Sequence, residues 1–117
     1  MYQKWIWIRI LFIAPYTYLG CWKDKFDKDN PRTLKDAEGR SNFLDGDYPW
    51  RENAIAKCFE TAKSWGHMIF ALQDGGQCFT EEPGLDHNHE HYGPSSDCSE
   101  DGEGGTFAND VYEINKG

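Results

Sequence analysis

The sequence lacks an excess of basic residues and therefore lacks the charge of a nucleic-acid-binding protein. Its 117 residues include 12 Lys and Arg against 20 Asp and Glu, which gives a formal net charge of −8. Proteins that bind DNA or RNA need cationic side chains to displace counterions from phosphates. Anionic membrane surfaces attract basic proteins for the same reason. We therefore expect neither nucleic acid nor an anionic membrane as a partner.

The sequence also lacks a long apolar run and a recognisable catalytic motif. Its most apolar stretch, residues 1–14 (MYQKWIWIRILFIA), is too short to span a membrane and is interrupted by Arg9. Neither the G-x-S-x-G motif of serine hydrolases nor the H-E-x-x-H motif of zinc proteases is present. The sequence thus predicts a protein that is not an enzyme and has no membrane span.

None of the cysteines stands in a CxxC pair. The four cysteines are Cys21, Cys58, Cys78 and Cys98. Zinc ribbons and thiol-redox motifs need closely spaced pairs, so both classes are excluded. An even number of cysteines in a short, acidic chain that is 15% aromatic indicates two disulfides and an oxidising, extracellular environment. A reduced cytosolic protein with buried thiols is the alternative, and the spacing alone leaves the pairing open.

What is present is one clear helical pattern among short strand patterns. Apolar residues recur three and four positions apart between Asn53, a plausible N-cap, and Trp65, and Gly66 follows as a C-cap. Strand patterns occur at 17–23, around 32–34, and at 67–73, 77–80 and 111–114. This order predicts an α+β fold with one helix packed on a twisted antiparallel sheet. The large core side chains we expect are Trp22, Phe59, Trp65 and Phe70.

Several short motifs resemble those of WSC and PAN (apple) modules. They are Leu19-Gly20-Cys21-Trp22 with Asp24, the helix-borne Cys58, the strand-borne Cys78 after Asp74-Gly75-Gly76, and the segment from Tyr92 to Cys98. Similar cysteine-containing modules occur in cephalotoxin-like secreted proteins. The resemblance implies an extracellular module over residues 17–117 that adheres to glycans or proteins. By similarity to PAN modules, it also implies the pairs Cys58–Cys78 and Cys21–Cys98. The chain has fewer cysteines than WSC modules, so no sugar site carries over residue by residue.

One loop has the composition of a sugar-binding site. Sugar sites combine an aromatic platform with side chains that hydrogen-bond hydroxyl groups. The candidate ligand-binding residues are Asp45, Asp47, Tyr48, Trp50 and Arg51. The alternative is that Trp50 packs over the start of the helix while the acidic residues cap turns.

Alternating histidines suggest a metal site. His87, His89 and His91 would share one face of an extended segment, where imidazoles suit zinc, copper or nickel. Asp86 and Glu90 could orient them. The alternative is a solvated polar loop. Calcium is a weaker candidate, at Asp45 with Asp47 or at Asp101 with Glu103, because neither pair matches an EF-hand loop.

The sequence predicts that residues 1–16 form an apolar strand or arm, in which side chains alternate between two apolar faces. Such an arm can pair with the sheet edge of a neighbouring subunit, and repetition of that contact gives a filament. The candidate assembly residues are Trp5, Ile6, Trp7, Ile8, Ile10 and Leu11. A self-assembling fibre subunit is therefore the alternative function. The segment could instead be a strand of its own domain or an uncleaved signal peptide.

Overall fold

The computed structural model describes residues 14–84 and 87–116. The candidate assembly residues Trp5, Ile6, Trp7, Ile8, Ile10 and Leu11 lie outside this range. Within it, five strands, one α-helix and one 3-10 turn follow one another along the chain. In order they are β1 (Tyr16–Lys23), β2 (Lys35–Asp36), η1 (Tyr48–Trp50), α2 (Ala54–Trp65), β3 (Ile69–Gln73), β4 (Gln77–Glu81) and β5 (Ala108–Ile114).

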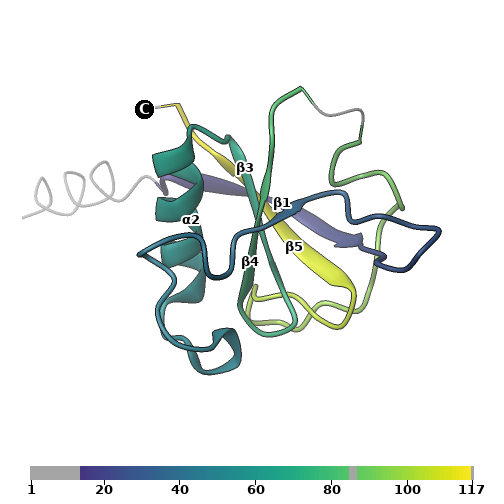
Figure 1. The fold of residues 1–117 in the computed structure, drawn as a ribbon, viewed down its shortest axis with the longest axis horizontal. Helices are drawn as coiled ribbons and strands as arrows, with labels where there is room; N and C mark the ends of the chain where they lie inside the picture. The colour runs from purple at the N-terminus through teal and green to yellow at the C-terminus, as the bar shows by residue number, and fades with distance from the viewer. Residues whose placement is uncertain (1–13, 85–86, 117) are drawn as a thin grey trace, which may run out of the picture.

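The strands form one antiparallel sheet in the order β1-β5-β3-β4-β2, and α2 packs on one face of it (Figure 1). The predicted α+β fold is therefore confirmed. Every residue of β3 is buried, because successive side chains point to opposite faces and both faces are covered. Phe70 and Leu72 pack with the helix, whereas Ile69 and Ala71 pack in a second cluster with Phe79.

The predicted large core residues divide into buried and peripheral side chains. Phe70 is fully buried, and Phe59 on α2 is 9% exposed. Trp22 and Trp65 are only partly buried and pack against the edges of the two clusters. Large aromatic side chains often reach the surface at one edge because a small core cannot enclose them completely.

Helix α2 begins and ends close to the predicted positions. Asn53 precedes its first residue with a left-handed backbone (φ 54°), and its side chain makes no capping hydrogen bond, contrary to its predicted role. Its carbonyl accepts the N–H of Lys57 at 3.0 Å. Gly66 closes the helix in the left-handed conformation, as predicted, and donates its N–H to the carbonyls of Ala62 and Lys63.

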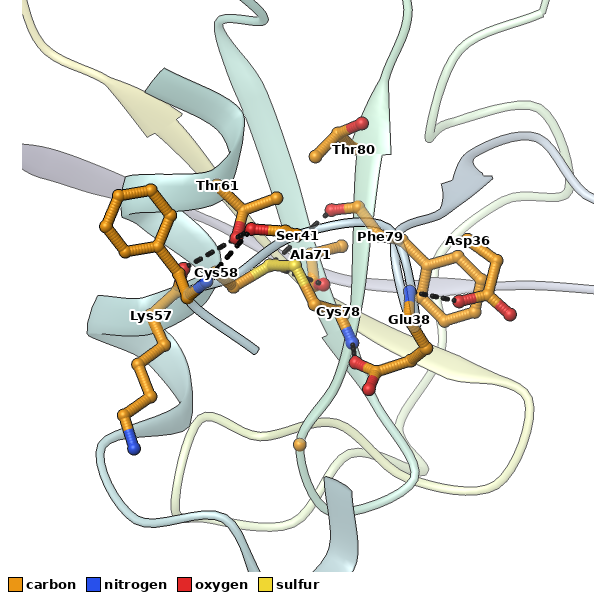
Figure 2. The surroundings of a disulfide bond; sticks show 12 residues. Asp36, Glu38, Ser41, Lys57, Cys58, Thr61, Ala71, Cys78, Phe79 and Thr80 are labelled. Atoms are coloured by element: carbon orange, nitrogen blue, oxygen red, sulfur yellow. Dashed lines mark hydrogen bonds between the residues drawn. A yellow bond between two sulfur atoms is a disulfide. The ribbon is translucent and has the colours of Figure 1, made fainter. Parts of the chain in front are cut away.

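The two disulfides are Cys58–Cys78 and Cys21–Cys98, the pairing that the resemblance implies. Cys58–Cys78 ties α2 to β4 in the core, where both residues are fully buried (Figure 2). Cys21–Cys98 ties β1 to the long segment before β5. No helix among the described residues is long and apolar enough to cross a membrane.

Strand β5 begins three residues earlier than the pattern predicts. The short edge strand β2 comes directly after the strand that was predicted around residues 32–34. The early part of β5 contains Asn109 and Asp110, polar residues that are nevertheless 0% and 1% exposed. Asp110 accepts the hydroxyl of Tyr18 at 2.5 Å and the N–H of Gly104 at 2.9 Å. Burial of these polar groups depends on such partners, which an alternation of apolar residues does not indicate.

Candidate functional site

The loop before α2 exposes its tryptophan beside a hollow. Trp50 is 83% exposed at the end of the turn η1. It therefore does not pack over the start of the helix, which was the alternative to a binding role. The hollow has a volume of about 260 Å³ and is lined by Asp45, Gly46, Asp47, Trp50, Arg51, Glu52 and Lys57.

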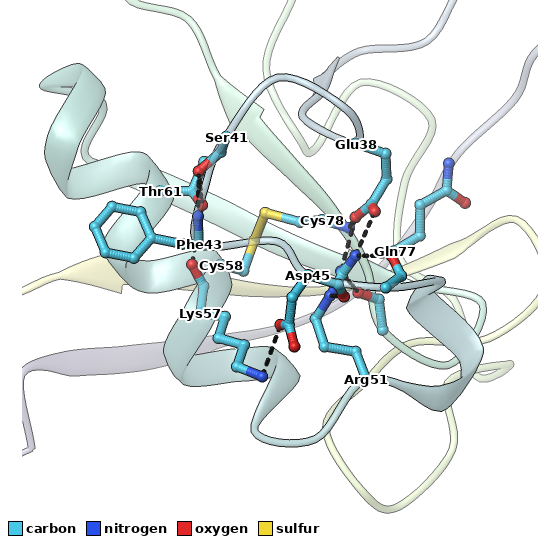
Figure 3. Close-up of polar contacts among 12 residues, drawn as sticks. Glu38, Ser41, Phe43, Asp45, Arg51, Lys57, Cys58, Thr61, Gln77 and Cys78 are labelled. Carbon is cyan, nitrogen blue, oxygen red and sulfur yellow. Dashed lines mark hydrogen bonds and ion pairs between the residues drawn. A yellow bond between two sulfur atoms is a disulfide. The ribbon is translucent and has the colours of Figure 1, made fainter.

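The buried side chain of Arg51 stabilises this loop. Its side chain is 0% exposed, and its guanidinium donates to both carboxylate oxygens of Glu38, at 2.9 and 2.6 Å (Figure 3). It also donates to the carbonyls of Asp45 at 3.0 Å and Gly76 at 3.3 Å. Such bidentate pairs fix geometry as well as adding energy. The charge of Arg51 is thus engaged within the protein, while its neighbour Trp50 points into solvent.

Glu38 connects the loop to the disulfide-bonded strand. Oε2 of Glu38 accepts from Nη1 of Arg51 and also from the backbone N–H of Cys78, at 2.9 Å in both cases. The backbone of η1 also approaches the β3–β4 turn closely. A Cβ atom on Gly76 would lie 2.8 Å from the carbonyl oxygen of Tyr48, so this approach requires glycine. No local pattern in the sequence indicates the role of Glu38, because it lies 13 residues from its partner Arg51.

Two further contacts stabilise the loop, one at the hollow and one beside it. Lys57 on α2 lies 2.8 Å from the carboxylate of Asp45, and its hydrogen bond lowers the pKa of that carboxyl below the usual value. The hydroxyl of Tyr48 donates to Asp74 at 3.3 Å. Burial, followed by the charge of Asp74, raises the pKa of Tyr48. Of the predicted ligand-binding residues, Asp45, Asp47, Trp50 and Arg51 line the hollow, and Tyr48 does not.

The histidines do not share a face as predicted. The chain turns at residues 89–92, and the rings of His87 and His91 lie together with centroids 4.1 Å apart. His89 is 8% exposed. Its Nδ1 lies 3.0 Å from Glu81, and its ring contacts Trp22 edge-on. The extended geometry was therefore wrong, because the turn separates His89 from the other two.

The geometry of the potential ligand atoms bears on the metal predictions. Among the described residues, one group of three such atoms lies close together, formed by Cys21, Cys98 and Asp110. Both sulfurs are already joined in a disulfide and have no lone thiolate to offer a metal. The predictions of a metal site at His87, His89 and His91 and of a calcium site stay predictions.

No protein-family model matches the chain, and no curated protein matches it. The similarity to WSC and PAN modules therefore stays an expectation from short motifs.

Proposed function

We propose that the protein is a secreted, non-enzymatic binding module that recognises glycans through the Trp50 loop. The observation that carries this proposal is the 83% exposure of Trp50 on a loop held by a buried ion pair. A large aromatic side chain in solvent is available for stacking, and a rigid loop loses little conformational entropy when a ligand binds. The resemblance to extracellular modules supports the same function.

The charges around the hollow indicate which glycans fit. Arg51 is paired with Glu38, and Lys57 is paired with Asp45. Two lining carboxylates, Asp47 and Glu52, make no ion pair among the described residues. They can accept hydroxyl hydrogen bonds, but they repel sulfate and carboxylate groups. We therefore expect neutral or amino sugars to bind in preference to sulfated or sialylated ones.

The two disulfides support the extracellular placement. Disulfides persist in oxidising compartments and are rare in the reducing cytosol. The acidic net charge of −8 is in keeping with a protein that avoids anionic polymers and membrane surfaces.

Substitution of Trp50 tests the proposal directly. A glycan array first identifies a ligand, and calorimetry then compares wild type with Trp50→Ala. We expect an affinity loss of at least about tenfold, because a central aromatic contact carries much of the energy of a small site. The melting temperature should stay unchanged, since the side chain contacts solvent rather than the core.

Phe43→Ala is the matched control. Phe43 is another exposed aromatic residue near α2 (44% exposed), but it does not line the hollow (Figure 3). It should bind as wild type does. A wild type that retains no glycan on the array, or a Trp50→Ala variant with unchanged affinity, would exclude the proposed site.

A fibre subunit is the second candidate, favoured by the position of β1. This strand lies at one edge of the sheet and follows directly after the apolar arm. Backbone bonds from Gly93 and Ser95 cover its outer edge near Cys21 and Lys23. Among the described residues, none of these bonds covers the half that begins at Tyr16. Such an open edge is a template for pairing with another chain.

If the arm drives assembly, deletion of residues 1–14 converts large particles into monomers. Light scattering on full-length and shortened protein at equal concentration measures this change. The shortened protein must keep its melting temperature, which serves as the control for folding. Particles of the same size in both forms would rule out assembly through the arm.

A further inference from the structure

The hollow beside η1 contains both cationic and anionic side chains. Its ionised lining residues are Asp45, Asp47, Arg51, Glu52 and Lys57. A charge that is already paired within the protein attracts a ligand much less than one that is not. The contacts of the two cations therefore decide which charge the hollow presents.

Both cations are paired with carboxylates of the protein. The guanidinium of Arg51 binds both oxygens of Glu38, and its side chain is 0% exposed. The ammonium of Lys57 lies 2.8 Å from the carboxylate of Asp45. Figure 3 shows these two contacts, with Arg51 directed toward Glu38 and Lys57 toward Asp45. The charges of the lining that stay unbalanced are therefore carboxylates.

The unbalanced carboxylates are those of Asp47 and Glu52, which lie on either side of η1 in the chain. Both residues are exposed. Asp47 directly precedes η1, and its side chain makes no capping hydrogen bond there. Among the described residues, neither carboxylate forms an ion pair with a lysine or arginine. Two free carboxylates on one hollow favour a positively charged ligand over a neutral one.

The first residue of η1 gives a separate indication of negative potential. The pKa of Tyr48 is raised by burial first, and then by the negative charges of Asp74, Glu38 and Asp36. Carboxylates oppose the formation of a phenolate because they create a negative potential at the hydroxyl. The same potential favours a cation beside this turn.

Trp50 adds an aromatic face to this negatively charged hollow. Its side chain is 83% exposed. The face of an indole ring attracts cations and also packs against the apolar face of a ring. The hollow has a volume of about 260 Å³, which is near the lower limit of ligand pockets and suits a single ring. A ligand that joins a ring to a positive charge uses both properties.

We propose, on the basis of the glycan-binding function above, that this hollow selects sugar rings that carry a free ammonium group. Glucosamine units in a β-1,4-linked chain are such rings. The sugar ring packs on Trp50, and its ammonium group pairs with the carboxylates of Asp47 and Glu52. A neutral or N-acetylated ring packs on the tryptophan in the same way but has no charge for the two carboxylates. Ammonium sugars therefore bind more tightly than both.

Three tetrasaccharides of the same β-1,4 linkage test this selectivity by calorimetry on the full chain. They are built from glucosamine, N-acetylglucosamine and glucose, and they differ at C2, which carries an ammonium, an acetamide or a hydroxyl group. The buffer is mildly acidic, so that the amine is protonated while the carboxylates stay ionised, and it contains EDTA to remove calcium. We expect the glucosamine tetrasaccharide to bind at least about fivefold more tightly than the other two.

Salt dependence gives a second readout of the same contact. The advantage of the glucosamine tetrasaccharide should shrink as sodium chloride is raised, because salt screens the pairing of exposed charges. Equal affinities for the glucosamine and glucose tetrasaccharides would overturn the selectivity for ammonium sugars and leave the glycan-binding function standing. Binding of none of the three would also overturn it, and the glycan array then decides on glycan binding itself.

Asp47→Asn and Glu52→Gln test whether the hollow supplies the selectivity. Each variant removes one free carboxylate, so the fivefold preference for glucosamine over glucose should narrow to about twofold. Glu113→Gln is the matched control, because it removes one exposed carboxylate on β5 that does not line the hollow. It should keep the wild-type preference. An unchanged preference in both hollow variants, or the same narrowing in Glu113→Gln, would overturn the assignment to this hollow.

Trp50→Ala and the peptide tetralysine separate a sugar site from attraction to the acidic protein as a whole. Trp50→Ala should lose at least about tenfold in affinity for the glucosamine tetrasaccharide, because the ring loses its platform. Tetralysine carries ammonium groups without a sugar ring and should bind wild type at least about fivefold more weakly than the tetrasaccharide. An unaffected Trp50→Ala variant, or tetralysine that binds as tightly as the sugar, would show that charge alone attracts the ligand.

Discussion

Replacing Cys21 and Cys98 together by alanine lowers the free energy of unfolding by about 4.5 kcal/mol on the chain-entropy model. The same change at Cys58 and Cys78 costs about 3 kcal/mol on this model. The difference follows from the loops that the bonds close, since the paired residues are 77 positions apart in the first case and 20 in the second. Urea denaturation followed by tryptophan fluorescence measures both.

The burial of the two disulfides offers a second explanation for their contributions to stability, namely core packing. Cys58 and Cys78 are both fully buried, so alanine there also leaves a small void between α2 and β4. If packing dominated over chain entropy, removal of the Cys58–Cys78 bond would be the more damaging change. A reversed ranking of the two double variants would therefore show that the core contact, and not the closed loop, supplies most of the stabilisation.

Glu38→Gln destabilises the protein by about 3 kcal/mol, because it leaves the guanidinium of Arg51 buried without its counter-charge. The side chain of Arg51 is 0% exposed and that of Glu38 is 20% exposed, so water cannot fully replace the lost carboxylate. Glutamine also weakens the hydrogen bond that the backbone N–H of Cys78 donates to Glu38, because a neutral amide oxygen is a weaker acceptor than a carboxylate. Chemical denaturation at neutral pH measures the loss.

Two further variants show whether the loss comes from the unpaired charge. Lys57→Ala removes an ion pair at the surface and should cost less than about 1 kcal/mol. The double variant Glu38→Gln with Arg51→Met removes both buried charges and should be less destabilised than the sum of the single variants. A Glu38→Gln variant as stable as wild type would show that Arg51 is satisfied by its carbonyl partners alone.

The Arg51–Glu38 pair connects stability with the proposed function. Arg51 also ties the backbone before Trp50 to the β3–β4 turn, because its guanidinium donates to the carbonyls of Asp45 and Gly76. Loss of the pair therefore frees the turn that presents the tryptophan. In Glu38→Gln, glycan affinity should fall even under conditions where the protein is fully folded, because the loop then loses more entropy on binding.

Local patterns in the sequence determined the helix, most strands and the α+β class. The apolar spacing between Asn53 and Trp65 is repeated within each turn of a helix, so neighbouring residues alone reveal it. Gly66 likewise indicates where the helix ends, because glycine readily adopts the left-handed backbone of a helix C-cap. The cysteines indicated two disulfides, and the resemblance to known modules supplied their pairing.

Only the tertiary structure decided which side chains meet across long separations. Glu38 meets Arg51, His89 contacts Glu81, and Phe107 and Phe26 together line a second hollow. The pairing of strands and the packing of loops on them bring such residues together. Neither process leaves a periodic signal in the chain, because each contact depends on the path of the whole backbone. The sequence therefore determined that Trp50 has the chemistry of a binding residue, and the fold decided that it lies in solvent.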